Sequence, residues 1–120
     1  GPAEFKVARC YQLGYCGEKD AVEAAKWFQK GAEHGYWAAQ DSLCGDYYWG
    51  HGIKQDYEEA YFWKLVADYT RAEIGLAIVS GVPMPTKLTR EQEEAVKKRV
   101  GDWEKTHPVP TRADQPEPNP

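Results

Sequence analysis

The sequence predicts an all-α fold, an α-α superhelix (solenoid) of helix-turn-helix repeats, from two observations. Residues 39–67 reappear 36 positions nearer the N-terminus without a gap. Within this stretch, apolar residues recur at helical spacing on both sides of a glycine-containing turn. Repetition at a fixed period of this size is typical of repeat architectures. The matched pairs are Ala39 with Ala3, Leu43 with Val7, Tyr47 with Tyr11, Gly50 with Gly14, Asp56 with Asp20, Ala60 with Ala24, and Trp63 with Trp27.

The first half of the unit is predicted to be a helix that ends at a glycine turn. Ala39, Leu43 and Tyr47 are four residues apart and therefore share one helix face. Gly50 and Gly52 follow, and glycine readily adopts the backbone angles that end a helix and turn the chain.

The second half of the unit is predicted to be a helix capped by an aspartate. Asp56 is suited to accept hydrogen bonds from the first free backbone N–H groups. Ala60, Trp63 and Ala67 then form a stripe at spacings of three and four residues. We expect Trp63 and its equivalent Trp27 to be buried between the paired helices.

The first copy gives the same arrangement on the positions Tyr11, Gly14, Asp20, Ala24 and Trp27. We expect helices to about residue 13, over residues 20–33 and over residues 37–49, with His34-Gly35 closing the second helix. Two clear units result, residues 3–35 and 36–69.

These residues resemble the Sel-one-like repeat, a relative of the tetratricopeptide repeat. The unit at 39–67 matches the pattern, with Cys44 at a position usually held by a small glycine. The first copy has Cys16, Gly17 and Gly31 where the second has Gly52, Ile53 and Ala67. The resemblance covers residues 3–69 and implies a bacterial protein of helical hairpins that binds other proteins.

The C-terminal half departs from the period. Residues 70–86 are predicted to be a degenerate third unit that includes a helix over residues 71–79. A capping box from Thr89 to Gln92 opens a capping helix over residues 88–106. We expect its stripe of Val96, Val100 and Trp103 to dock on the degenerate unit. The proline-rich tail 107–120 lacks any hydrophobic pattern.

The N-terminus and the bulk composition restrict the remaining possibilities. Gly1-Pro2 without a methionine is interpreted as the scar of a cleaved tag, so residues 1–5 are set apart from the repeat domain at 6–106. The net charge of −4 argues against general nucleic-acid binding. No stretch is apolar enough for a membrane span. Because relatives are often exported, we expect a periplasmic or secreted protein rather than a cytoplasmic one.

The cysteines and histidines offer no recognisable chemistry. Three of each are present, and none shows the spacing of a zinc site. No nucleophile–base motif or phosphate-binding loop appears. We therefore predict no metal, no cofactor and no enzymatic activity. Cys44 is predicted to be a buried hydrophobe, and whether Cys10 and Cys16 form a disulfide stays open.

One face of the third helix is a candidate partner-binding surface. With Leu43 at the core, Trp37, Asp41 and Tyr48 lie together on the opposite side. The corresponding face of the first helix carries Arg9 and Gln12. Exposed aromatics there would form a binding groove, and packing of the same rings against a neighbouring helix is the alternative.

Three functions are weighed. The resemblance implies a protein–protein interaction adaptor, in a bacterial envelope, virulence or signalling setting, and this is the leading expectation. Some family members resemble immunity proteins that neutralise secreted phospholipase toxins, which makes an inhibitor the second. A hydrolase or β-lactam-binding protein, as attributed to cysteine-rich relatives, is the weakest, because their regular disulfide pairs are absent.

Overall fold

The computed structural model describes residues 2–76 and 87–109, and within them every regular element is a helix. The all-α prediction is therefore confirmed for this part of the chain. The helices are α1 (Pro2–Leu13), α2 (Ala21–Glu33), α3 (Trp37–Trp49), α4 (Tyr57–Glu73) and α5 (Arg90–Thr106). The predicted bounds of the first three helices agree with these to within one residue.

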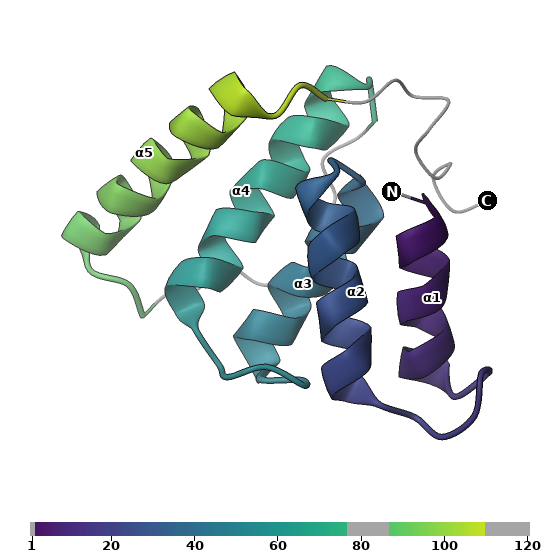
Figure 1. The fold of residues 1–120 in the computed structure, drawn as a ribbon. Coiled ribbons are helices and arrows are strands. Elements are labelled where there is room, and N and C mark those ends of the chain that lie inside the picture. Colours follow the sequence, from purple (N-terminus) through teal and green to yellow (C-terminus); the bar gives the residue numbers. More distant parts are fainter. Residues whose placement is uncertain (1, 77–86, 110–120) are drawn as a thin grey trace.

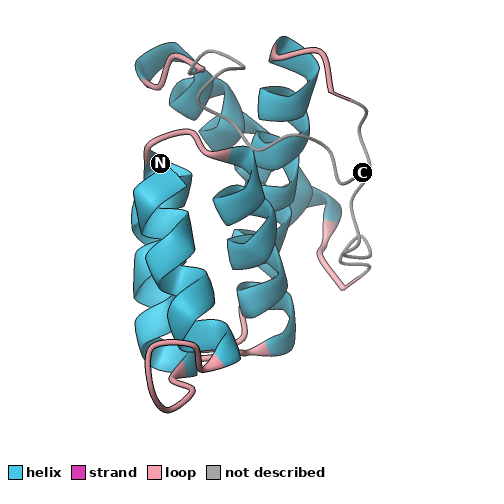
Figure 2. Ribbon diagram, turned by 90° about the vertical axis from the view of Figure 1, so that its right-hand side faces the viewer, coloured by secondary structure: helices cyan, strands magenta, loops and turns pink. Residues whose placement is uncertain are grey.

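Each helix packs on its neighbours in the chain, α1 on α2, α2 on α3, α3 on α4 and α4 on α5. Figure 1 shows this succession from α1 to α5 across the molecule. The α1–α2 and α3–α4 connections both lie at the lower end in Figures 1 and 2. Two helical hairpins are thus stacked in the same orientation, and α5 covers the outer side of the second.

The two hairpin turns have the same hydrogen bonds, shifted by one repeat. The amide of Asp20 donates to Tyr11 O at 3.0 Å, and the amide of Asp56 donates to Tyr47 O at 2.9 Å. Gly14 and Gly50 each occupy the left-handed region, with φ of 79° and 74°. The turn glycines predicted from the repeat therefore have the conformation that requires glycine.

Side-chain caps begin α2, α4 and α5, whereas α3 begins at Tyr36 without one. Asp20 accepts from the amide of Glu23 at 3.1 Å. Asp56 accepts from the amides of Glu58 and Glu59 at 3.0 and 3.2 Å. Thr89 and Gln92 form the predicted capping box before α5.

The core lies along the facing sides of α2, α3 and α4. Ala24, Leu43, Ala60 and Trp63 are buried in it, as the repeat pattern predicts, and Cys44 is fully buried and donates to Ala60 O at 3.1 Å. Trp27 is the exception, because it is only partly buried. Trp63 is covered by Trp103 of α5, with ring centroids 5.2 Å apart, whereas Trp27 lies along a groove beside α2.

The α5 helix caps the stack through its predicted apolar stripe. Val96 and Val100 are buried, and Trp103 packs edge-on against Phe62 and Trp63 of α4. Trp103 therefore docks on the second repeat, and the docking of the stripe on the degenerate unit stays a prediction, because residues 77–86 lie outside the described residues. The surface that Trp103 of α5 contacts is the aromatic outer side of the second repeat, with Phe62 and Trp63.

The structure contradicts the separate helix predicted over residues 71–79 in the part that it describes, residues 71–76. Residues 71–73 are the last turn of α4, and Gly75 at φ 77° ends the helix. The amides of Ile74 and Leu76 donate back to the carbonyls of Thr70 and Arg71. The buried face of α4 continues to Thr70 and Arg71, and the helix ends beyond the repeat length. Residues 77–86, like the tail from 110, lie outside the described residues.

The packed structure begins at Pro2, inside the segment interpreted as a tag scar. Phe5 of α1 packs against Phe28 and Tyr36, with ring centroids 5.7 and 5.3 Å apart. Phe28 is fully buried. Residues 2–5 are therefore structurally part of the first hairpin.

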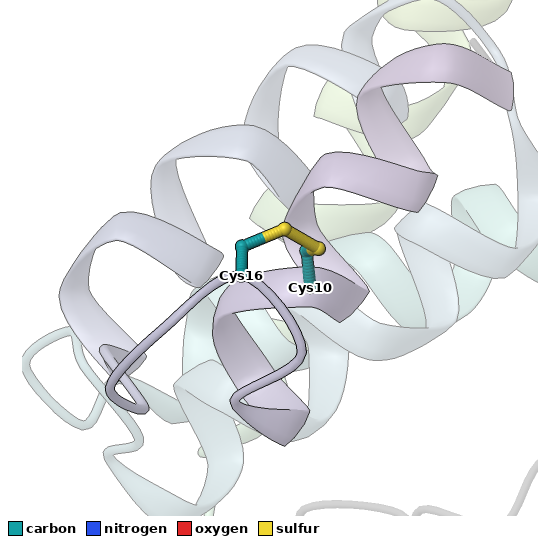
Figure 3. Close-up of a disulfide and its surroundings, with 2 residues drawn as sticks. All are labelled: Cys10 and Cys16. Atoms are coloured by element: carbon teal, nitrogen blue, oxygen red, sulfur yellow. A yellow bond between two sulfur atoms is a disulfide. The ribbon is translucent and has the colours of Figure 1, made fainter.

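A disulfide joins Cys10 and Cys16 across the first turn (Figure 3). Cys10 lies on the last turns of α1, and Cys16 lies in the exposed connection to α2. The bond answers the question that the sequence left open. It ties the loop back to the helix that precedes it.

Breaking this disulfide should destabilise the protein by about 2 kcal/mol, because a cross-link over a short loop restricts the unfolded chain. The measurement is thermal unfolding with and without reductant, with the Cys10→Ser/Cys16→Ser double variant as control. Reductant should lower the Tm of the wild type only. An identical Tm for both proteins in both conditions would contradict the expectation.

Candidate functional site

The predicted face of α3 is turned toward α4 at its N-terminal end. The guanidinium of Arg71 lies 4.2 Å from the centroid of the Trp37 ring and 3.5 Å from Asp41 Oδ2. Arg71 is 5% exposed, and Trp37 and Asp41 are partly buried. Burial raises the pKa of Asp41, and Arg71 opposes that rise. These two predicted site residues thus form an internal contact with the end of α4.

The other predicted site residues lie apart from this pair. Tyr48 packs on Tyr57 at the start of α4, with ring centroids 5.4 Å apart. Arg9 is exposed on α1 and donates to Gln12 at 3.2 Å. Gln12 lines a cavity with residues at the C-terminal end of α3, far along the helix from Trp37. The structure therefore does not bring the five residues together in one groove, and the rings of Trp37 and Tyr48 both contact residues of α4.

Asp41→Lys is expected to destabilise the protein by about 3 kcal/mol, because it replaces the carboxylate beside the buried Arg71 with a second cation. Chemical unfolding of the variant measures this cost. The matched control is Glu94→Lys on the exposed side of α5, which should change stability by less than about 0.5 kcal/mol. Equal stability of the two variants would show that Asp41 is free to serve a partner.

Exposed apolar side chains gather elsewhere, at the end of the molecule that carries both hairpin turns. The large hydrophobic residues that are exposed in the described parts of the chain are Leu13 (37%), Tyr15 (79%), Val22 (52%) and Trp49 (60%). Leu13 ends α1, Tyr15 lies in the α1–α2 connection, Val22 begins α2, and Trp49 ends α3. We call these four residues the turn edge.

A cavity of about 310 Å³ lies at the same end. It is lined by residues of the α1 end, the α2 start and the α3 end: Gln12, Lys19, Ala21, Ala24, Phe28, Asp46 and His51. Asp46 is 7% exposed, and burial raises the pKa of its carboxyl to about 7. His51 is exposed on the second turn.

An apolar groove of about 510 Å³ runs along the outer side of α2. Val22 and Trp27 line it, and Ile53 of the second turn closes one end. Lys30 places its ammonium 4.2 Å from the centroid of the Trp27 ring. Through Val22, this groove continues from the turn edge.

No sequence pattern points to Asp46, and only a weak one points to the turn edge. Asp46 aligns with Cys10 at the repeat offset, and that pairing suggests no shared chemistry. Tyr15 and Trp49 stand next to the turn glycines, where a search for chemical motifs passes over them. A search for large apolar residues beside the predicted turns would have found them.

No set of three or more His, Cys, Asp or Glu side chains is placed to hold a metal ion within residues 2–76 and 87–109. None of the described helices is both long and apolar enough to cross a membrane.

Stacked helical hairpins of one repeating sequence define an α-α repeat protein. The Sel1 repeat pattern matches residues 1–36 and 37–63, and the chain belongs to this family. The sequence resemblance is thereby confirmed.

A solved structure has the same fold: the crystal structure of c5321, described as a protective antigen present in uropathogenic Escherichia coli strains displaying an SLR fold. The two share 26% sequence identity with a TM-score of 0.67 over 88% of this chain. The match spans only 22% of that protein. No curated protein matches this chain.

Proposed function

We propose that this protein is a non-catalytic protein-interaction scaffold that binds its partner through the turn edge. The observation that carries the proposal is the gathering of four exposed apolar residues, Leu13, Tyr15, Val22 and Trp49, at one end of the stack. Scattered single apolar residues on a surface are ordinary, whereas a cluster from three different elements marks a contact surface.

The chemistry of the turn edge suits a protein partner. Tyr and Trp bury large areas at a small entropic cost and are enriched among the residues that dominate binding energy. The apolar groove beside Val22 and Trp27 extends the surface along α2. Lys26 and Lys30 border that groove and favour acidic side chains on the part of the partner that follows it.

The disulfide supports a compartment outside the cytoplasm. Disulfides persist in oxidising surroundings such as the periplasm or the extracellular space. Cys16 is exposed, so its bond with Cys10 is open to cellular reductants. We therefore place the protein in the periplasm or outside the cell, in agreement with the sequence expectation.

The proposal is tested by the Tyr15→Ser/Trp49→Ser double variant. Both side chains are mostly exposed, so the Tm should stay within a few degrees while the affinity for a purified partner falls at least about a hundredfold. The matched control is Lys98→Ser on the exposed side of α5, which should bind like the wild type. Unchanged affinity of the double variant would overturn the turn edge as the binding site.

A further inference from the structure

The cavity beside the turn edge holds a buried carboxylate without a partner. Asp46 projects from the last turns of α3 and is more than nine-tenths buried. Among the described residues, no hydrogen bond or ion pair engages its carboxylate, although buried carboxylates are ordinarily paired. The end of α3 does not explain the burial of this carboxylate. The amides of Gly50 and His51 donate to the backbone carbonyl of Asp46 and not to its side chain.

The surroundings of Asp46 are those of a small binding site. Phe28, Ala21 and Ala24 supply apolar walls, and the amide of Gln12 offers a further polar group. The charged or titratable groups that line the cavity with Asp46 are Lys19, before α2, and His51, after α3. Lys19 lies with its stem against Gly14, close enough that a Cβ there would touch it at 3.1 Å. Lys19 and His51 are both exposed, so solvent screens their charges more than that of Asp46.

We propose that this cavity receives the cationic end of a lysine or arginine side chain from the protein that binds the turn edge. The inference rests on the proposed function and adds the chemistry of its recognition. Apolar walls fit the methylene stem of such a side chain, and the carboxylate pairs with its head. A volume of about 310 Å³ is sufficient for one long side chain and too small for a helix or strand.

This site has a characteristic pH dependence. An empty, buried Asp46 favours its protonated form, with a pKa of about 7, and only the ionised form pairs with a cation. Binding of a cation should therefore strengthen as pH rises, roughly thirtyfold between pH 5.5 and 8.5 if the competent fraction alone changes. His51 lines the same cavity, so the variant His51→Ala isolates the contribution of Asp46 to the pH dependence.

The test uses blocked amino acids and the full chain. N-acetyl-arginine methylamide is titrated and followed by amide NMR shifts at Gly45 and Gly50, with N-acetyl-citrulline methylamide as the neutral match. We expect saturable binding of the arginine compound and an affinity for the citrulline compound that is at least tenfold lower. The affinity for the arginine compound should rise with pH in both the wild type and His51→Ala. Equal shifts with both compounds, or affinity that does not rise with pH, would overturn the proposal without any variant.

Asp46→Asn and the purified partner complete the experiment. The variant keeps side-chain size and should bind the arginine compound at least tenfold more weakly. Asp46→Asn should also lower the affinity for the partner. Free arginine should compete with the partner for binding to the wild-type protein and not for binding to the variant. Normal partner affinity in Asp46→Asn together with lost affinity in Tyr15→Ser/Trp49→Ser would reject the cationic site and keep the proposed function. Binding of free arginine without competition against the partner would assign the cavity to a small ligand and reject a partner side chain.

Discussion

Replacing Trp63 by alanine is expected to reduce the free energy of unfolding by about 3–5 kcal/mol, as for other large core side chains. Trp63 is 2% exposed and packs against both Phe62 of its own helix and Trp103 of α5. Its loss removes the surface on which α5 docks, so the Tm should fall by about 10 °C or more.

The repeat supplies a matched control for this variant. Trp27 occupies the same place in the first repeat, is only partly buried, and lines the groove beside α2. Trp27→Ala should therefore cost only about 1–2 kcal/mol. Trp63→Phe keeps an aromatic ring and removes an indole N–H that is buried without a hydrogen bond. It should cost less than Trp63→Ala, and equal losses for Trp63→Ala and Trp27→Ala would contradict the account of the core.

Gly52→Ala is expected to destabilise the protein by about 3 kcal/mol or more, because backbone strain and a steric clash act together. Gly52 has a φ of 72°, which side chains rarely adopt. A Cβ at this position would lie 2.1 Å from the carbonyl oxygen of Ala21, in the backbone that begins α2. The two hairpins would have to separate to admit it.

Gly101→Ala tests whether the effect is specific. Gly101 lies within α5, and a Cβ there would meet no neighbouring atom within 4 Å. Alanine should stabilise that helix by about 0.5–1 kcal/mol. Urea unfolding of both variants should therefore shift the midpoint in opposite directions. A Gly52→Ala protein as stable as the wild type would show that the hairpins do not meet at this turn.

The repeat pattern predicted the helices well because it reports local geometry. Asp20, Asp56 and Thr89 cap helices through their own side chains, and Gly14 and Gly50 end them through their own backbone angles. These interactions lie within a few residues in the chain. The spacing of residues in the sequence is therefore sufficient to predict these caps and turns.

The contacts between helices were predicted less well, because spacing identifies a helix face and not the neighbour that covers it. The spacing left open whether the side of α3 opposite Leu43 is exposed or packed, and the structure places Arg71 over Trp37 there. That cover depends on the extension of α4 to Glu73, beyond the repeat length.

The role of Gly52 and the isolation of Asp46 were missed for the same reason. Gly52 was predicted as a helix breaker, whereas the structure also shows its close approach to α2 of the preceding hairpin. At the equivalent position, Cys16 carries a side chain and a disulfide. Asp46 lines a cavity together with Phe28 and Ala24 from the other hairpin, which no local pattern indicates.

Site-specific photo-crosslinking tests the central claim most directly. A benzophenone amino acid replaces Tyr15 or Trp49 at the turn edge, and the same residue replaces Lys98 on α5 as control. A third position, Asp68, samples the side of α4 near Asp41 and Trp37. We predict that positions 15 and 49 crosslink one and the same partner protein, and that positions 68 and 98 do not. A partner crosslinked from position 68 or 98 and absent from positions 15 and 49 would contradict the account.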